Sequence, residues 1–452
     1  MKKVIILMTA VLLSVGLYAE DHVMAATKGS KVERQKTAGA QSSEALSLSL
    51  AEAQQYALEQ NRSLKNASLA VQEAYAARWQ TIAAMLPQVD GSYSYSNYLG
   101  YTAELSMGTG AAMKINMPNV GAWTLTASMG LNAQGIIGAL LNNIAIDMKK
   151  IALEQSESQL TGSVMSAYVS VLALQSIAGL LDSSLVNIQE LETITQNAVD
   201  AGAAEQTAAD QIRVRVNTLK NSINMQRYSI ELAMSSLKVL LDVPVETELT
   251  LTEDLADVLS PERVLTLLAE NFSIDNNLNY KLLQKQVELA KKNVHMAGWA
   301  YGPTLSVAYN YTDQHYYGEG GMRMTPPNVI QLSVRMPLWS SGKRAAGVVE
   351  KKIALEEAKN TLSETTANLE IQYHQLCFNL TNAYDTYLNE KDNIEVSQRV
   401  FASATNKYKY GASSNMELTN ASNDLINAQS TYVQAILSLV NAQVELEKFL
   451  NN

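Results

Sequence analysis

The feature that most constrains this chain is an internal duplication. The six residues KKIALE occur at Lys149–Glu154 and again at Lys351–Glu356. At a separation of 216 positions the flanking matches are Asn61 with Asn277, Pro87 with Pro303, Tyr93 with Tyr309 and Tyr95 with Tyr311. At a separation of 207 positions they are Leu125 with Leu332, Leu131 with Leu338 and Gly135 with Gly342. An ordered series of matches predicts two tandem copies of one unit, residues 47–258 and 259–452.

The N-terminal residues predict export from the cytoplasm. The segment MKKVIILMTAVLLSVGLYA carries two lysines, an apolar run and a small residue at Ala19, which is the pattern of a secretory signal peptide. We expect residues 1–26 to be removed, with cleavage after Ala19, Ala25 or Ala26, and residues 27–46 to form a flexible leader. A retained anchor helix is the alternative, but the apolar run is short for a membrane span.

Composition and motifs argue against nucleic-acid binding and against catalysis. The 452 residues carry a formal net charge of −10 without a basic block, which disfavours a nucleic-acid partner. The four histidines stand apart from any catalytic or metal-binding spacing, and neither H-E-x-x-H nor G-x-S-x-G occurs. The single cysteine, Cys377, leaves no disulfide framework. We therefore expect no enzyme activity, no catalytic residues, no cofactor and no metal.

Each copy begins with a predicted helix that is followed by a proline. The helical patterns cover residues 50–85 and 263–301, and Pro87 and Pro303 follow them. Proline cannot continue a helix, so both helices should end at the same place in the two copies.

An alternating pattern follows and predicts two strands in each copy. The four segments are residues 92–101, 121–131, 305–313 and 330–338. Strict alternation of apolar and polar residues is typical of strands. Gly-, Met- and Asn-rich loops are expected at about 102–121 and 314–328.

One side of these strands is apolar enough to face lipid. The residues expected to do so are Trp123, Leu125, Met129, Ile330, Leu332 and Val334. A soluble sheet with one buried face would also alternate, but the segments have the length that a tilted membrane strand needs and carry aromatic residues. Four strands cannot close a barrel, and an open edge in lipid leaves backbone groups unpaired. The sequence therefore predicts a membrane barrel shared between chains.

The longest segments predict coiled-coil helices arranged as hairpins. Apolar residues recur every seven positions at Ile146, Leu153, Leu160, Ala167, Leu174, Leu181 and Ile188, at Val348, Leu355, Leu362, Leu369, Leu376 and Ala383, and at Tyr373, Leu380, Tyr387, Ile394, Phe401 and Tyr408. A strict seven-residue period favours supercoiled helices. Gly202 and Gly411 interrupt the helical pattern, and glycine is the usual residue where a helix ends in a left-handed conformation. Each copy should thus contain one long helical hairpin.

Four passages in the same order resemble the TolC-type outer-membrane efflux factors. They are LSLAEAQQYALEQNRSLKNA at residues 48–67, MLPQVDGSYSYS at 85–96, LLDVPVETELTLTEDL at 240–255 and VRMPLWSSGKR at 334–344. The two glycine tips complete the resemblance, which covers nearly the whole mature chain. It implies a homotrimer in which a shared 12-stranded β-barrel in the outer membrane joins an α-helical tunnel in the periplasm.

The resemblance also implies partners and a gate. The tunnel would dock through the tips at Gly202 and Gly411 on a periplasmic adaptor (membrane fusion) protein and an inner-membrane pump of the RND or ABC type. Tyr408 and Glu417 match a tyrosine and an acidic residue of the family's periplasmic aperture, and Asn420 stands where the family has a further acidic residue. Ser413 stands where the family has a basic residue, so the aperture is matched in part.

These expectations combine into one fold class and one function. The chain should be mainly α with membrane β, four strands per chain and an internal two-fold repeat. It should pass small molecules or other cargo from the pump to the exterior, as part of a tripartite export system in the outer membrane. The alternative is a trimeric, barrel-anchored coiled-coil adhesin without a transport role, which would place its strands consecutively at the C-terminus. The sequence names no cargo.

Overall fold

The computed structural model describes residues 46–105, 113–131, 133–202, 204–258, 261–270, 272–317 and 326–451. The chain divides into two compact units, and each unit combines segments from both sequence copies. The first unit takes the described parts of residues 71–149 and 283–361. The second unit takes the described parts of residues 33–70, 150–282 and 362–452.

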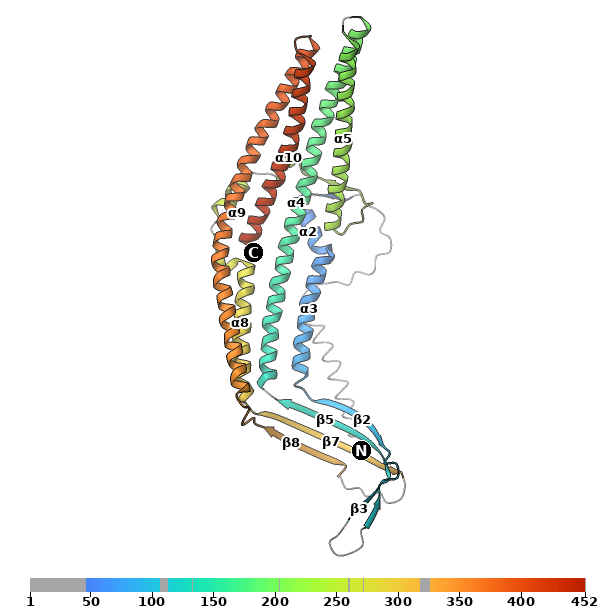
Figure 1. The fold of residues 1–452 in the computed structure, drawn as a ribbon, viewed down its shortest axis with the longest axis vertical. Helices are drawn as coiled ribbons and strands as arrows, with labels where there is room; N and C mark the ends of the chain where they lie inside the picture. The colour runs from blue at the N-terminus through green and yellow to red at the C-terminus, as the bar shows by residue number, and fades with distance from the viewer. Residues whose placement is uncertain are drawn as a thin grey trace. The chain divides into compact units, whose positions relative to one another are not determined.

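The first unit contains a four-stranded antiparallel sheet in the order β2-β5-β7-β8 (Figure 1). The strands are β2 (Gln88–Ser96), β5 (Asn119–Leu131), β7 (Thr304–Tyr317) and β8 (Asn328–Arg335). Each sequence copy supplies two of them, and β5 of the first copy pairs directly with β7 of the second. Each of the four segments predicted as strands overlaps one strand of this sheet, and the first copy contains further short strands.

The predicted bounds of the first strand and of both loops are wrong. The expected strand at 92–101 ends at Ser96 as β2, because the chain turns at Leu99 and Gly100, whose φ angles are 52° and 77°. Asn97 starts this turn, its Oδ1 accepting the Leu99 N–H at 2.8 Å, which is the local bond that asparagine offers in turns.

The expected loops contain strand structure. Within residues 102–121, β3 (Thr102–Leu105) and β4 (Met113–Asn116) form a small antiparallel pair, and β5 begins at Asn119. In the second copy β7 extends to Tyr317, past the predicted loop start at 314. The alternation of short polar segments was too weak to predict these additional pairs.

Four helices pass through both units: α3 (Arg62–Ala83), α4 (Ala133–Asp200), α8 (Leu278–Gly298) and α9 (Lys343–Lys409). Within the first unit, Asn142 Nδ2 donates to Thr81 Oγ1 at 2.6 Å and Lys285 Nζ to Asp147 Oδ2 at 2.9 Å. These bonds join α4 to α3 and to α8. A short 3₁₀ turn, η2 (Trp299–Tyr301), connects α8 to the sheet.

The second unit is built from two helical hairpins. The first joins α4 to α5 (Gln206–Leu240), and the second joins α9 to α10 (Asn415–Asn451). The buried members of the predicted heptad series in this unit are Leu160, Leu181, Ile188, Leu369, Leu380, Ala383, Tyr387, Ile394 and Phe401. The sevenfold pattern therefore identified part of the buried stripe that such a period requires, whereas other members such as Leu153, Leu174 and Leu376 are only partly buried.

Short elements complete this unit. A parallel pair joins β1 (Leu46–Leu48) to β6 (Leu249–Leu251). The remaining elements are α2 (Leu50–Gln60), α6 (Leu255–Val258), α7 (Pro261–Ala269) and η1 (Ile274–Asn276). Ser49 and Glu52 form a reciprocal cap at the start of α2, which satisfies backbone donors that a helix start leaves open. The buried Tyr168 hydroxyl of α4 donates to the Leu48 carbonyl at 3.0 Å.

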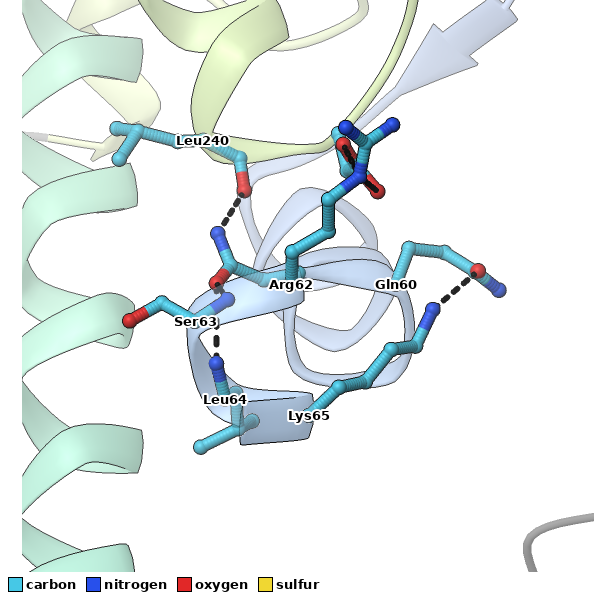
Figure 2. A network of polar contacts seen from close by, with 8 residues as sticks. Gln60, Arg62, Ser63, Leu64, Lys65 and Leu240 are labelled. Carbon is cyan, nitrogen blue, oxygen red and sulfur yellow. Dashed lines mark hydrogen bonds and ion pairs between the residues drawn. The ribbon is translucent and has the colours of Figure 1, made fainter. Parts of the chain in front are cut away.

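The predicted single helix over residues 50–85 is broken at Asn61. The Asn61 Oδ1 accepts the N–H groups of Ser63 and Leu64 at 2.8 and 3.2 Å, which caps α3. Its Nδ2 donates to the Leu240 carbonyl at 2.8 Å, near the end of α5 (Figure 2). One buried side chain thus starts a helix and ties it to another, because an N-cap asparagine can accept and donate at once.

The second copy builds the same break at Asn277. The predicted helix over 263–301 is divided there, and Asn277 Oδ1 accepts the N–H groups of Asn279 and Tyr280 at 3.0 and 3.2 Å. Its Nδ2 donates to the Phe449 carbonyl at 3.3 Å, near the end of α10. The sequence match between the two asparagines therefore reflects a duplicated structural role.

We expect Asn61→Ala to lower the free energy of unfolding by about 1–3 kcal/mol, because it removes a cap and leaves the partly buried Leu240 carbonyl without its side-chain donor. Asn66→Ala is the matched control, since Asn66 is exposed on the same helix and should change stability by less than about 0.5 kcal/mol. Thermal unfolding followed by far-UV circular dichroism in detergent measures both. Equal melting of the two variants would show that the Asn61 bonds contribute nothing.

Candidate functional site

The sheet of the first unit has one apolar face. Directly paired residues of antiparallel strands point to the same side, so the register assigns every side chain to a face. Val307, for example, lies opposite both Met129 and Leu332. The large apolar and aromatic residues of this side, which we call the apolar face, include Tyr93, Tyr95, Trp123, Leu125, Met129, Leu131, Leu305, Val307, Tyr309, Tyr311, Tyr317, Ile330, Leu332 and Val334. Asp313, opposite Trp123, and His315, opposite Gly121, lie on the same side towards one end. All six residues predicted to face lipid are among them.

The apolar face is open in this chain. Trp123, Ile330, Leu332 and Val334 each leave at least 64% of their side-chain surface exposed. Exposed apolar surface on this scale marks a face that contacts a partner or lipid rather than water. The structure brings the predicted residues together on one surface, and lipid contact stays a prediction.

The opposite side of the sheet is polar. Its residues, which we call the polar face, include Ser92, Ser94, Thr124, Thr126, Ser128, Asn310, Thr312, Gln314, Gln331, Ser333 and Arg335. Thr126 Oγ1 donates to Asn310 Oδ1 at 2.8 Å, and the Thr124 and Thr312 hydroxyls lie 3.4 Å apart. A sheet that is apolar on one side and hydrogen-bonding on the other suits a wall between lipid and water.

Aromatic rings gather at one end of the apolar face. The rings of Tyr93 and Trp123 lie 4.9 Å apart, and Tyr317 contacts both Tyr95 and His315, at 5.8 and 4.7 Å between centroids. Gly121 lies beneath them, where an added Cβ would come within 2.9 Å of the Tyr93 hydroxyl oxygen. Glycine allows this close approach, and aromatic girdles of this kind flank the apolar band of membrane barrels.

The two outer strands of the sheet, β2 and β8, each pair on one side. Among the described residues no strand pairs with their outer edges. An edge strand presents a row of unpaired N–H and C=O groups, which is a template for another chain.

The helix-hairpin tips of the second unit are formed by the two predicted glycines. Gly202 and Gly411 have φ angles of 74° and 70°, the left-handed region that favours glycine. At the second tip the Gly411 N–H donates to the Tyr408 carbonyl and the Ala412 N–H to the Lys407 carbonyl, at 2.9 and 2.8 Å. These are the two bonds of a Schellman motif, which ends the helix and reverses the chain.

The predicted aperture residue Glu417 lies in the first turn of α10 and is held by its own tip. Ser413 Oγ donates to Glu417 Oε2 at 2.8 Å, and Lys407 Nζ lies 3.8 Å from Oε1. The Glu417 carboxylate is about half exposed, at 52%. Ser413 thus contacts the carboxylate by a hydrogen bond from a neutral hydroxyl, and the cation comes from Lys407.

The other two predicted aperture residues lie apart from this cluster. Tyr408 is half-buried against the apolar residues of the tips, whereas Asn420 is exposed on α10. The buried set, which we call the tip core, includes Ile188, Leu191, Ile212, Val216, Phe401, Ala404, Leu418 and Leu425. The structure places all three candidates near the second tip, and no hydrogen bond or ion pair joins two of them among the described residues.

Two basic residues near the tips, Lys409 and Arg215, were not predicted as site residues from the sequence. Lys409 Nζ lies 2.5 Å from Glu190 Oε1, which joins α9 to α4, and this hydrogen bond raises the pKa of Lys409, so the lysine stays charged at neutral pH. Burial lowers the pKa of Arg215 on α5, and the nearby Tyr408 opposes that shift. Contacts between residues some two hundred positions apart leave no local pattern that could have predicted them.

A groove of about 440 Å³ lies between α5 and α10 close to these residues. Arg215, Gln211 and Thr218 line one side, and Met416 and Asn423 line the other. In the part of the chain that the structure describes, no group of three or more His, Cys, Asp or Glu side chains could hold a metal ion.

The known proteins that this chain resembles are described as outer membrane efflux proteins. The family description "outer membrane efflux protein" matches residues 273–452. The chain is 21% identical over 316 residues to the probable efflux pump outer membrane protein TtgC of Pseudomonas putida, covering 66% of this chain and 62% of TtgC. It is also 21% identical over 369 residues to the outer membrane efflux protein BepC of Brucella suis, covering 80% of this chain and 76% of BepC. The chain thus spans less than two thirds of the length of TtgC.

Solved structures share the fold. The crystal structure of CusC superposes with a TM-score of 0.70 at 16% identity, covering 92% of this chain and 96% of CusC. The outer membrane protein VceC of Vibrio cholerae superposes with a TM-score of 0.69 at 14% identity, covering 89% of this chain and 96% of VceC.

Proposed function

Because the chain belongs to the TolC-type outer membrane efflux protein family and is a protein of the outer membrane that extends into the periplasm, we propose that it is the outer-membrane channel of a tripartite export system. In this role it passes small molecules or other cargo from an inner-membrane pump to the exterior.

The two-faced, open-edged sheet is the observation that supports this proposal most. The outer edges of β2 and β8 have no strand partner among the described residues, and unpaired backbone groups in lipid cost several kcal/mol each. A second copy can pair its β2 with β8 of the first. Three copies of the four-stranded sheet then give twelve strands, within the range of known membrane barrels. The apolar face contacts lipid in this assembly, and the polar face lines the lumen.

The helical hairpins supply the periplasmic part of the proposed conduit. Three copies contribute twelve helical segments to a tunnel, and the tips at Gly202 and Gly411 contact a periplasmic adaptor protein. The inner-membrane pump behind the adaptor is of the RND or ABC type. The relative TtgC is named as part of an efflux pump, which supports this arrangement. A channel of this kind requires no catalytic residue, because it passes cargo without changing it chemically.

Tyr408, Glu417 and Asn420 form the periplasmic aperture in this proposal. Glu417 is half exposed beside the second tip, and Tyr408 packs on the tip core of the same unit. Residues 1–26 are the signal peptide and 27–45 most of the leader; both lie outside the described residues. The adhesin alternative is disfavoured because the strands come in two pairs separated by long helices.

We expect the detergent-purified protein to be a trimer that forms a conducting pore. Native mass spectrometry should give three times the mass of the mature chain, since four strands cannot satisfy their own edges. Planar bilayers should show discrete conductance steps after its addition. A stable monomer that still inserts into bilayers would contradict the shared barrel, and a trimer without conductance would contradict the channel.

A further inference from the structure

The turn between β8 and α9 exposes an unusual amount of apolar surface. Leu338 and Trp339 are each 86% exposed, and Met336 just before them is 61% exposed. Together with Leu99, Leu338 and Trp339 are the most exposed large apolar residues described. Singly exposed apolar residues are common, but a contiguous exposed group marks an interaction surface.

The turn is held in a defined shape. Arg344 Nη1 donates to the Pro337 carbonyl at 2.6 Å and its Nε to Ser340 Oγ at 3.0 Å. The same guanidinium lies over the ring of Tyr301, 4.9 Å from its centroid. Ser341 and Gly342 follow with φ angles of 47° and 82°, which reverse the chain into α9. Leu338 and Trp339 are therefore presented outward by a fixed turn.

The turn lies at the end of the sheet where the helices begin. Arg335, the last residue of β8, pairs with Thr304, the first residue of β7. Met336 and Leu338 continue the alternation of the apolar face beyond Val334. The exposed turn is thus continuous with the surface that we assign to lipid.

Its composition fits the boundary between a membrane and water. Tryptophan is enriched at membrane interfaces, where its ring lies among apolar groups and its N–H stays near water. Lys343 begins α9 beside the turn and is exposed, and no ion-pair partner for it occurs in the described chain. A lysine at this level attracts the phosphate of an anionic lipid.

We propose that Leu338 and Trp339 insert into the periplasm-facing leaflet of the membrane and that Lys343 binds its anionic headgroups, which fixes the depth of the barrel. This inference rests on the proposed lipid contact of the sheet. It applies to one copy only, because the matched turn of the first copy reads LNAQGII from Leu131 and lacks both the tryptophan and the cations. Each chain therefore carries one such anchor.

The depth of Trp339 can be measured with quenching lipids. In a variant whose three other tryptophans, Trp79, Trp123 and Trp299, are phenylalanine, phosphatidylcholine brominated near the headgroup should quench the emission of Trp339, because the anchor places its ring at the interface. Lipid brominated at the chain end should quench less. A background without tryptophan that carries Tyr410→Trp at the exposed tip is the control that no lipid should quench.

A variant that retains only Trp123 separates this inference from the proposed barrel. Quenching of Trp123 without quenching of Trp339 would overturn the anchor and leave the barrel intact, whereas loss of both would overturn the lipid contact of the sheet. Protection of Trp339 from aqueous iodide without lipid quenching would show that protein covers the turn, which also overturns the anchor. Should the tryptophan variants fail to fold, Trp339→Cys on a Cys377→Ser background, labelled with a polarity-sensitive fluorophore, gives the same reading.

The role of Lys343 is tested by lipid charge. Replacing part of the phosphatidylcholine by phosphatidylglycerol should increase headgroup-level quenching of Trp339, and Lys343→Gln should abolish that increase. Lys352→Gln is the matched control, because Lys352 is exposed further along the same helix. An increase that survives in Lys343→Gln would overturn the headgroup contact.

Discussion

Leu332→Arg should prevent the protein from assembling in the outer membrane, while Ser333→Arg in the next position should assemble almost normally. Leu332 lies on the apolar face, opposite Val307, and is 66% exposed. An arginine facing lipid near the bilayer midplane costs roughly 2–4 kcal/mol per chain. Three copies in one barrel multiply that cost.

The neighbouring residue isolates the effect of the face. Ser333 pairs with Ser306 on the polar face. The side chain introduced by Ser333→Arg would therefore lie in the water of the proposed lumen. Leu125→Arg and Thr126→Arg repeat the comparison in β5, although Thr126→Arg also loses the bond to Asn310. Heat-resistant trimer in isolated outer membranes, scored by gel mobility before and after boiling, measures assembly. Equal loss in Leu332→Arg and Ser333→Arg would show that the two faces are assigned wrongly.

Tyr408→Ala should raise the resting conductance of the pore, and Glu417→Gln should lower its preference for cations. Tyr408 is packed against the tip core, so its truncation leaves a cavity that loosens the closed tips. Three copies of Glu417 around one axis would form an acidic ring, which draws cations into a narrow passage.

Lys407 provides a sharper test of the Glu417 ring. Its ammonium lies 3.8 Å from the Glu417 carboxylate and offsets part of the negative charge. Lys407→Gln should therefore increase cation preference, opposite in sign to Glu417→Gln. Glu445→Gln is the control, because Glu445 lies far along α10 from the tip.

Reversal potentials in asymmetric salt, recorded in planar bilayers, give the selectivity, and the same recordings give the resting conductance. If Tyr408→Ala and Glu417→Gln both conduct like the parent, other residues close the entrance. Asp424 and Asp210 on the neighbouring tip helices would then be the next to replace.

The parts of the fold that follow a strong local period were predictable from the sequence. The sevenfold repeats indicated part of the buried stripe of the long helices, and the twofold alternation assigned Trp123 and Leu332 to one face of the strands, which the register confirms. Gly202 and Gly411 were correctly identified as helix ends, because few other residues adopt a positive φ there.

The helix breaks were missed although the sequence carried their signal. Asn61 and Asn277 were recognised as a repeated pair, yet their surroundings have good helix propensity, and the break depends on the carbonyls of Leu240 and Phe449 far along the chain. Propensity is a weak guide where a distant acceptor decides the conformation.

The candidate site was predictable only in part for a similar reason. The resemblance placed Tyr408 and Glu417 near the second tip, and Ser413 was identified as a departure. The ion pairs that the structure shows near the tips, Lys407 with Glu417 and Lys409 with Glu190, depend on how the helices of the hairpins pack. Charged residues on exposed helices have too many possible partners for the sequence alone to select one.

The unpaired edges of β2 and β8 have a genetic consequence. On the proposed assembly, a chain cannot complete its own barrel, so insertion and oligomerisation become a single event, and every barrel depends on the edges of all its members. A chain with a damaged β8 edge would then spoil the normal chains with which it assembles. At equal expression and random combination of the two kinds of chain, only about one trimer in eight would consist of normal chains alone, because all three members of the cyclic trimer must be normal. Such alleles should be dominant, whereas alleles that prevent synthesis should be recessive.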